Sequence, residues 1–438
     1  MKFAPIPCLL ALGGLIAAPH VRASAQSQSS LPASALRVIS VTATGSQRYT
    51  PEQIAAASGL AVGQMASEDD FRHAAQELGD TGAFRQVAYS YQYSATGTKL
   101  EFQVVDAKQF VPARFDNFVW FSDQDLVSKI QTAVPLFEGQ LPVTGNLADQ
   151  VSNALQGMVI ERNVQGRVDY IRSAAPDGPI SAILFSVTGP EIVIRDTHFA
   201  GAGPAELSSL QEAAKALAGE DYLRSILRAQ VAKDFLPVYL ARGYLKAAFG
   251  EPDAKIVNQQ PNQITVDVTF PVTPGQQFKL TGVDWTGNKL LPASSLQPLL
   301  HEKPGEPLNS VRLGEDLRAV SELYGTRGYV AAVVHPMPYF DDAASTVSYQ
   351  LQVHEGDLYH MGDLEIQGLE QNATDRLLLA WQLHKGDTYD SSYAQRFVHE
   401  ALLNQLVTGG WNISIHQSPD LPSKTVDVTL RFDPKLTP

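Results

Sequence analysis

Four side chains in the segment VHEGDLYH are of types that can bind a metal ion. They are His354, Glu355, Asp357 and His360. Their spacing does not match a zinc signature such as H-E-x-x-H, in which two histidines one helical turn apart share a face. We therefore interpret the four as solvated residues of a turn, and we expect no metal site here.

Two further patterns resemble parts of enzyme sites. Asp341 and Asp342, in YFDDAAS, form a carboxylate pair that is typical of a polar hairpin turn. The segment GAGPAEL (201–207) has glycines before an expected helix but lacks the lysine and the G-x-G-x-x-G spacing of a phosphate loop, which favours a turn. No G-x-S-x-G sequence is present to hold a nucleophilic serine. We expect a protein that is not an enzyme and uses no cofactor.

The only cysteine, Cys8, opens an apolar stretch, CLLALGGLIAA, near the N-terminus. Lys2 precedes this stretch and Ala23-Ser24-Ala25 follows it, which is the layout of a cleaved signal peptide over residues 1–25, with a polar leader over 26–35. A membrane anchor is the alternative, but the run is about half the ~20 residues that a span needs. The sequence therefore predicts an exported chain without thiol chemistry once the signal peptide is removed.

The charge of the chain limits its partners. The formal net charge is −13, and removing Lys2 and Arg22 with the signal peptide gives 31 − 46 = −15. An acidic chain without runs of Lys and Arg is poorly suited to nucleic acid. Its 438 residues exceed one compact core, so several domains are expected.

One twelve-residue arrangement occurs twice. LYGTRGYVAAVV (323–334) resembles VYLARGYLKAAF (238–249), and Gly328 follows Gly243 by 328 − 243 = 85 residues. Glycine just past the last apolar helical position ends a helix at least cost, because it accepts positive φ. We interpret each copy as a helix stop, with the following tyrosine packed back on the helix, and we call this glycine-centred motif the joint.

The joint belongs to a unit of roughly 80 residues that repeats along the chain. Glycine-ended strands are expected at VTATG (41–45), THFAG (197–201), VDWTG (283–287) and LEIQG (364–368). Strands with period-two alternation are expected around 100–104, 183–187, 264–270, 347–353 and 426–432.

Helices are expected between these strands. The apolar spacing Leu313, Leu317, Val320 and Tyr324 predicts one of them, with Asn309 as its N-cap. Others are expected at 51–57, 206–217 and 374–383. In the second unit Asn163 stands where glycine is expected. Each unit thus has the order strand–helix–helix–strand–strand.

Tandem exported units of this order resemble the POTRA domains of the BamA-like outer-membrane assembly factors. The resemblance rests on the glycine-ended strand, LYGTRGY and the last strand leading to VHEG (353–356). It implies an α+β fold of five β-α-α-β-β domains, each a small mixed sheet covered by two helices. Their ranges would be 36–107, 108–189, 190–275, 276–356 and 357–433. The β-barrel that follows such arrays in that family is not expected within these 438 residues, so the array would be either a stand-alone protein or a portion of a longer gene product.

The resemblance also implies a function. We expect a non-enzymatic periplasmic scaffold, associated with the outer membrane through a partner, that binds polypeptides by adding them as strands to open sheet edges. The partners would be an outer-membrane β-barrel protein or assembly machinery and unfolded outer-membrane clients, without nucleic acid or small-molecule substrates. The alternative is a soluble docking module of a secretion or cell-envelope complex.

The strand after each joint is the expected binding edge. The candidate residues are Leu245, Ala247, Phe249, Val330, Ala332 and Val334. A third candidate edge is NISIH (412–416), and proline at Ala247 or Ala332 should reduce peptide capture.

Overall fold

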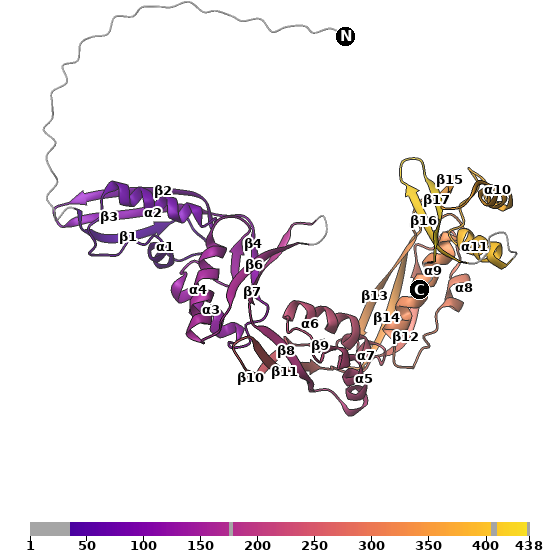
Figure 1. The fold of residues 1–438 in the computed structure, drawn as a ribbon, viewed down its shortest axis with the longest axis horizontal. Helices are drawn as coiled ribbons and strands as arrows, with labels where there is room; N and C mark the ends of the chain where they lie inside the picture. The colour runs from indigo at the N-terminus through magenta and orange to yellow at the C-terminus, as the bar shows by residue number, and fades with distance from the viewer. Residues whose placement is uncertain (1–35, 175–177, 404–409, 436–438) are drawn as a thin grey trace, which may run out of the picture. The chain divides into compact units, whose positions relative to one another are not determined.

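The computed structural model describes residues 36–174, 178–403 and 410–435 (Figure 1). The expected signal peptide, the leader and Cys8 lie outside these ranges. The chain divides into two compact units. The first contains Met1–Ala113, Val127–Ala154 and Arg172–Ile183, and the second contains Arg114–Leu126, Leu155–Ile171 and Leu184–Pro438.

The first sheet has the order β1-β3-β2, with β3 parallel to β1 and antiparallel to β2. Its elements are β1 (Val38–Thr44), α1 (Pro51–Ala57), α2 (Glu68–Asp80), β2 (Phe84–Ser94) and β3 (Gly97–Asp106). Helix α1 packs beside β1, and α2 packs beside β2. Helix α2 begins at a capping box of Ser67 and Asp70, and its buried face of Phe71, Ala74 and Leu78 recurs at helical spacing.

The second sheet has the order β5-β4-β7-β6, and the division between the two units runs through it. Its elements are β4 (Phe110–Phe115), α3 (Asp123–Ala133), β5 (Gln140–Pro142), α4 (Leu147–Glu161), β6 (Arg167–Ala174) and β7 (Ile180–Thr188).

The third sheet has the order β10-β11-β8, and the short β9 also pairs with β11. Its strands are β8 (Glu191–Ala200), β9 (Ala248–Phe249), β10 (Asp253–Gln259) and β11 (Gln263–Thr273). Its helices are α5 (Pro204–Ala214), α6 (Arg224–Gln230) and α7 (Leu236–Leu240). A π-helical turn, Val231–Phe235, joins α6 to α7 directly before Pro237, where the missing proline N–H interrupts the regular ladder.

The fourth and fifth sheets repeat the order of the first, as β12-β14-β13 and β15-β17-β16. The fourth contains β12 (Lys279–Thr286), α8 (Ala293–Leu296), α9 (Ser310–Gly325), β13 (Val333–Asp341) and β14 (Thr346–His354). The fifth contains β15 (His360–Gln367), α10 (Gln371–Ala380), α11 (Tyr393–Leu403), β16 (Trp411–Asp420) and β17 (Thr425–Pro434). Asn309 caps α9 as expected, accepting a hydrogen bond from the Arg312 N–H at 2.9 Å.

The glycine at the end of the first strand has the same role in four sheets. Gly287 has a φ of +77°, and a Cβ at this position would lie 2.2 Å from the Val353 carbonyl oxygen on β14. Gly45, Gly201 and Gly368 face the carbonyl of their own central strand at 2.0 to 2.3 Å in the same way. Glycine is required because the two backbones approach too closely for any side chain.

The α+β class of small mixed sheets with helices is confirmed. The helix expected at 206–217 begins earlier, at Pro204, and a 3-10 turn, Lys215–Leu217, continues α5 to the expected end. The helix expected at 374–383 begins and ends earlier, at Gln371–Ala380. The five domain ranges stay a prediction. Each sheet lies inside one of them except at Pro434, one residue beyond the fifth range.

Candidate strand-binding edges

The repeated joint is a helix stop. Gly328 has a φ of +88°, and the Tyr329 N–H donates to the Tyr324 carbonyl five residues back at 3.1 Å, which closes the end of α9. The two tyrosine rings meet edge to face at 6.5 Å. Gly243 repeats this geometry with a φ of +86°. The predicted stop and the predicted tyrosine packing are both confirmed.

The joint also connects to the sheet that follows. The Gly243 carbonyl accepts a hydrogen bond from the Phe278 N–H at 2.8 Å, and the Gly328 carbonyl accepts one from the Tyr359 N–H at 2.8 Å. Both donors lie directly before a first strand. In the second unit Asn163 takes the place of glycine with a φ of +55°, as expected. These contacts give the joints a structural role.

The strands expected directly after the joints are displaced. Leu245 and Val330 lie in turns, and the Ala247 N–H is used within its turn, donating to the Tyr244 carbonyl at 3.1 Å. The Ala332 N–H donates to the Tyr329 carbonyl in the same way. The expected strand placement was wrong at these four positions, because an extra turn follows each glycine. Proline at Ala247 or Ala332 would disturb a turn and would not test an edge.

The two remaining candidate residues do lie in strands. Phe249 ends the two-residue β9 and pairs with Val272. Val334 lies in β13 opposite Val353, and both its side chain and that of Phe249 contribute to packing. The true end strands of the third and fourth sheets are β10 and β13, which begin at Asp253 and Val333.

One edge of each sheet is covered by the chain itself. In the fourth sheet the Leu280 N–H donates to the Glu306 carbonyl at 3.0 Å, and the Gly305 N–H donates back to the Leu280 carbonyl at 2.7 Å. The Leu308 N–H adds a third bond, to the Phe278 carbonyl at 3.0 Å. A four-residue segment before α9 therefore occupies the outer edge of β12.

The same covering segment recurs beside all five sheets. Its copies are GQMA (63–66), GQLP (139–142), GEDY (219–222), GEPL (305–308) and GDTY (386–389). The glycine of each copy has a positive φ, between +82° and +96°, and no atom within 4 Å of an added Cβ. In the second sheet this segment forms the strand β5. Sequence reasoning missed this element, and the recurring glycine before a polar residue was the available signal.

The opposite end of each sheet is β2, β6, β10, β13 or β16. In β16 the Lys435 N–H donates to the Gly410 carbonyl at 2.8 Å, so even-numbered residues face β17. Pairs alternate along an antiparallel ladder, so the odd-numbered residues direct their backbone groups away from β17. No described residue accepts a hydrogen bond from the outward N–H of Ile413, Ile415 or Gln417.

The cluster of metal-ligand types is not assembled into one site. The partners are separate: His354 packs on His335, Glu355 accepts from the Tyr324 hydroxyl at 3.1 Å, Asp357 pairs with Lys424 at 2.6 Å, and the His360 ring meets the Gly386 carbonyl at 3.0 Å. Among the described residues no group of three or more His, Cys, Asp or Glu side chains is placed to hold a metal ion.

Tyr324, the hydrogen-bond partner of Glu355, has a raised pKa. Burial raises the pKa of the Tyr324 hydroxyl to about 12, and its hydrogen bond to Glu355 acts in the same direction. The same carboxylate accepts the Leu290 N–H at 2.6 Å. Glu355 therefore ties the end of α9 to the loop after β12.

The other two motifs are turns. Asp341 ends β13 and accepts the Ala344 N–H at 2.9 Å, while Asp342 in the same hairpin turn pairs with Lys246 at 2.5 Å. Gly203 is the N-cap of α5, and Pro204 is its first residue.

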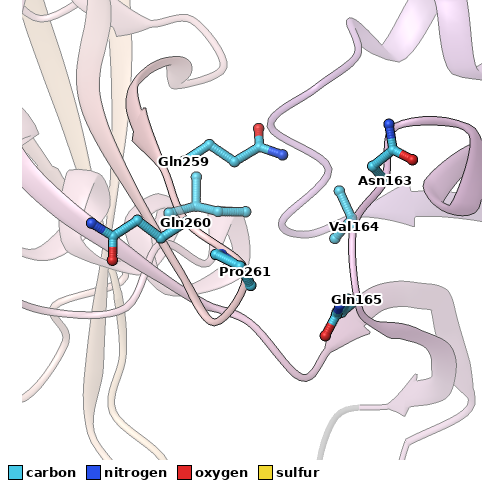
Figure 2. A pocket seen from close by; sticks show the side chains of 7 residues that line it. Asn163, Val164, Gln165, Gln259, Gln260 and Pro261 are labelled. Atoms are coloured by element: carbon cyan, nitrogen blue, oxygen red, sulfur yellow. The ribbon is translucent and has the colours of Figure 1, made fainter.

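A small pocket lies beside the Asn163 joint, within the second of the two compact units. Its volume is about 220 Å³, and Figure 2 labels six of its lining residues, from the segments 163–165 and 259–261. Gln259 extends toward the Asn163 side, while Gln260 extends away from it. The lining residues are amides and apolar groups without an acid or base, so this pocket has no means of proton transfer.

No helix in the described part of the chain has both the length and the apolar character needed to cross a membrane. Residues 278–356 match the sequence model of the POTRA family, described as a surface antigen variable number repeat. With the β-α-α-β-β order of the same segment, this match defines the class of module: residues 278–356 form a POTRA-type domain, and the predicted resemblance is confirmed.

Particular relatives share parts of the chain. A putative outer membrane protein assembly factor of Treponema pallidum (strain Nichols) is 27% identical over 156 residues, which make up 35% of this chain and 18% of that protein. The match thus spans less than a fifth of the relative's length. POTRA domains 3–5 of Haemophilus influenzae BamA are 23% identical with a TM-score of 0.44, covering 56% of this chain and 96% of that one. POTRA domains 1–3 of Anabaena Omp85 are 16% identical with a TM-score of 0.26, covering 57% and 98%.

Proposed function

We propose that this chain is a periplasmic, non-enzymatic scaffold in outer-membrane protein assembly that binds polypeptides by β-strand addition. The observation that carries the proposal is the asymmetry of the sheets. The covering segment occupies one edge of each sheet. At the opposite edge of the fifth sheet, β16 directs unpaired N–H groups outward, away from β17. Such groups recognise the backbone of an extended chain with little regard to its sequence.

The kind of protein supports the same role. Residues 278–356 match the POTRA family, and the relative in Treponema pallidum is named as a putative outer membrane protein assembly factor. The partners we propose are outer-membrane polypeptides in transit and the components of an assembly machinery. Export by the expected signal peptide would place the chain in the same compartment as these partners.

Deleting the gene tests this function. Without the scaffold, the amount of folded outer-membrane protein should fall, because clients lose a binding surface on their route. Quantitative analysis of isolated outer membranes measures this amount, and re-expression of the chain should restore it. An unchanged outer-membrane profile would contradict the proposal. Capture of a secretion complex without assembly components would favour the docking-module alternative.

A further inference from the structure

Two prolines change the free edge of the fourth sheet. Pro336 and Pro338 lie inside β13, opposite Leu351 and Tyr349, and the register runs without a shift from Val333 to Asp341. Proline has no N–H, so a continuous ladder must take its donors from the intervening residues. Odd-numbered residues such as Met337 therefore face β14, and both prolines lie at outward positions.

The outward positions of β13 thus lack donors in the middle of the strand. Among the four outward residues of this edge, only Val334 and Phe340 have an N–H group. An added strand needs alternating donors and acceptors, and two consecutive outward donors are missing here. The edge is exposed, since every residue from His335 to Asp341 is exposed to solvent, but it cannot complete a ladder.

The equivalent edge of the fifth sheet is open. Its outward residues are Trp411, Ile413, Ile415, Gln417 and Pro419, so four consecutive N–H groups precede the single proline. The difference between the two edges lies in proline position, since both strands pair with their central strand over at least nine residues.

We propose that Pro336 and Pro338 block strand addition at β13, so that of these two edges only β16 accepts an incoming chain. This inference rests on the proposed function and adds to it a choice between edges. A barred edge also prevents two copies of the chain from pairing through β13, which an exposed flat edge would otherwise invite.

The β16 edge further selects the kind of strand. Along a strand, the direction of the N–H groups and the face of the side chains both alternate with a period of two. The residues whose N–H groups point away from β17, Trp411, Ile413 and Ile415, therefore have their side chains on one face of the sheet, packed against the core. Asn412 and His416 lie on the other face and are exposed. A bound strand would place every second side chain beside the apolar row. The ligand is therefore an extended segment that alternates apolar and polar residues.

Replacing both prolines tests whether they block strand addition at β13. In the variant Pro336→Val with Pro338→Val, β13 gains two outward donors while its bonds to β14 stay unchanged. The probe is a fluorescent peptide of about ten residues that alternates valine with threonine or lysine. A peptide with the same composition in two blocks is the control. Calorimetric titration of the intact chain gives the number of peptides bound, and ultracentrifugation gives its self-association.

The double variant should bind one more alternating peptide than the wild type or should dimerise through β13. Binding of an equal number of peptides without dimerisation would overturn the inference. If neither the wild type nor the double variant binds the peptide, both the proposed function and this inference are contradicted. If the wild type binds and the double variant gains nothing, only the assignment of edges falls. Equal binding of the block peptide would overturn the selection for alternation.

Discussion

At the residue scale, glycines with nearly the same φ sit in different surroundings. Gly328 and Gly305 both have a φ of +88°. A Cβ on Gly328 would lie 2.6 Å from a Leu358 methyl carbon and 2.9 Å from the Tyr359 carbonyl oxygen, whereas Gly305 has no atom within 4 Å. The pair separates the cost of the left-handed backbone from the cost of the close approach.

Gly305→Ala should lower the free energy of unfolding by roughly 1–2 kcal/mol, the cost of a left-handed non-glycine residue. Gly328→Ala should cost more by at least about 1 kcal/mol, because the joint must also shift to admit a methyl group. Urea unfolding of the intact chain measures both. Equal losses would show that the joint is not tightly packed against the residues before β15.

Tyr324 predicts a pH dependence. Its pKa is about 12 in the folded chain against 10 as the ordinary value, so the unfolded chain releases this proton first as pH rises. The stabilisation is therefore complete below about pH 10 and is lost between about pH 10 and 12. Tyr324→Phe should weaken this loss, as measured by urea unfolding across that range. An identical alkaline profile in the variant would contradict the assignment.

At the element scale, local signals predicted helix ends well and strand starts poorly. Gly328 and Asn309 act through their own backbone, so the sequence alone located the ends of α9. The letters LKAAF look like a strand, but the N–H of Ala247 closes a turn, which depends on the packing of Tyr244 against the helix end. The covering segments were missed because three non-local hydrogen bonds define them and no periodicity marks them.

The candidate site was predicted only in part for the same reason. NISIH (412–416) was correctly placed in an end strand, β16. The outward direction of its odd-numbered residues depends on the register with β17, which pairs Trp411 with Pro434. Register is a property of two strands, so one strand's sequence cannot supply it.

Ile415→Pro should abolish binding of the alternating peptide at β16, because it removes one outward N–H while leaving the bonds to β17. Ile415→Ala is the matched control, since it shortens the same half-buried side chain and keeps the N–H. Both should lose about 1–2 kcal/mol of stability. Fluorescence anisotropy measures binding. Loss of binding in both variants would assign recognition to the side chain instead.

At the scale of the whole molecule, the net charge of −13 is not the source of binding in this account. Backbone hydrogen bonds and an apolar row recognise the ligand, and salt screens neither strongly. The affinity for a neutral alternating peptide should therefore change less than about threefold between low and high salt. A steep fall in affinity with salt would instead indicate recognition by charge.

Hydrogen exchange of the intact chain, with and without a bound unfolded outer-membrane polypeptide, tests strand addition most directly. Strand addition at β16 predicts slower exchange at its outward amides, at Trp411, Ile413, Ile415 and Gln417, with unchanged exchange along the outward edge of β13. Binding that protects helix surfaces while leaving the β16 amides unchanged would contradict it.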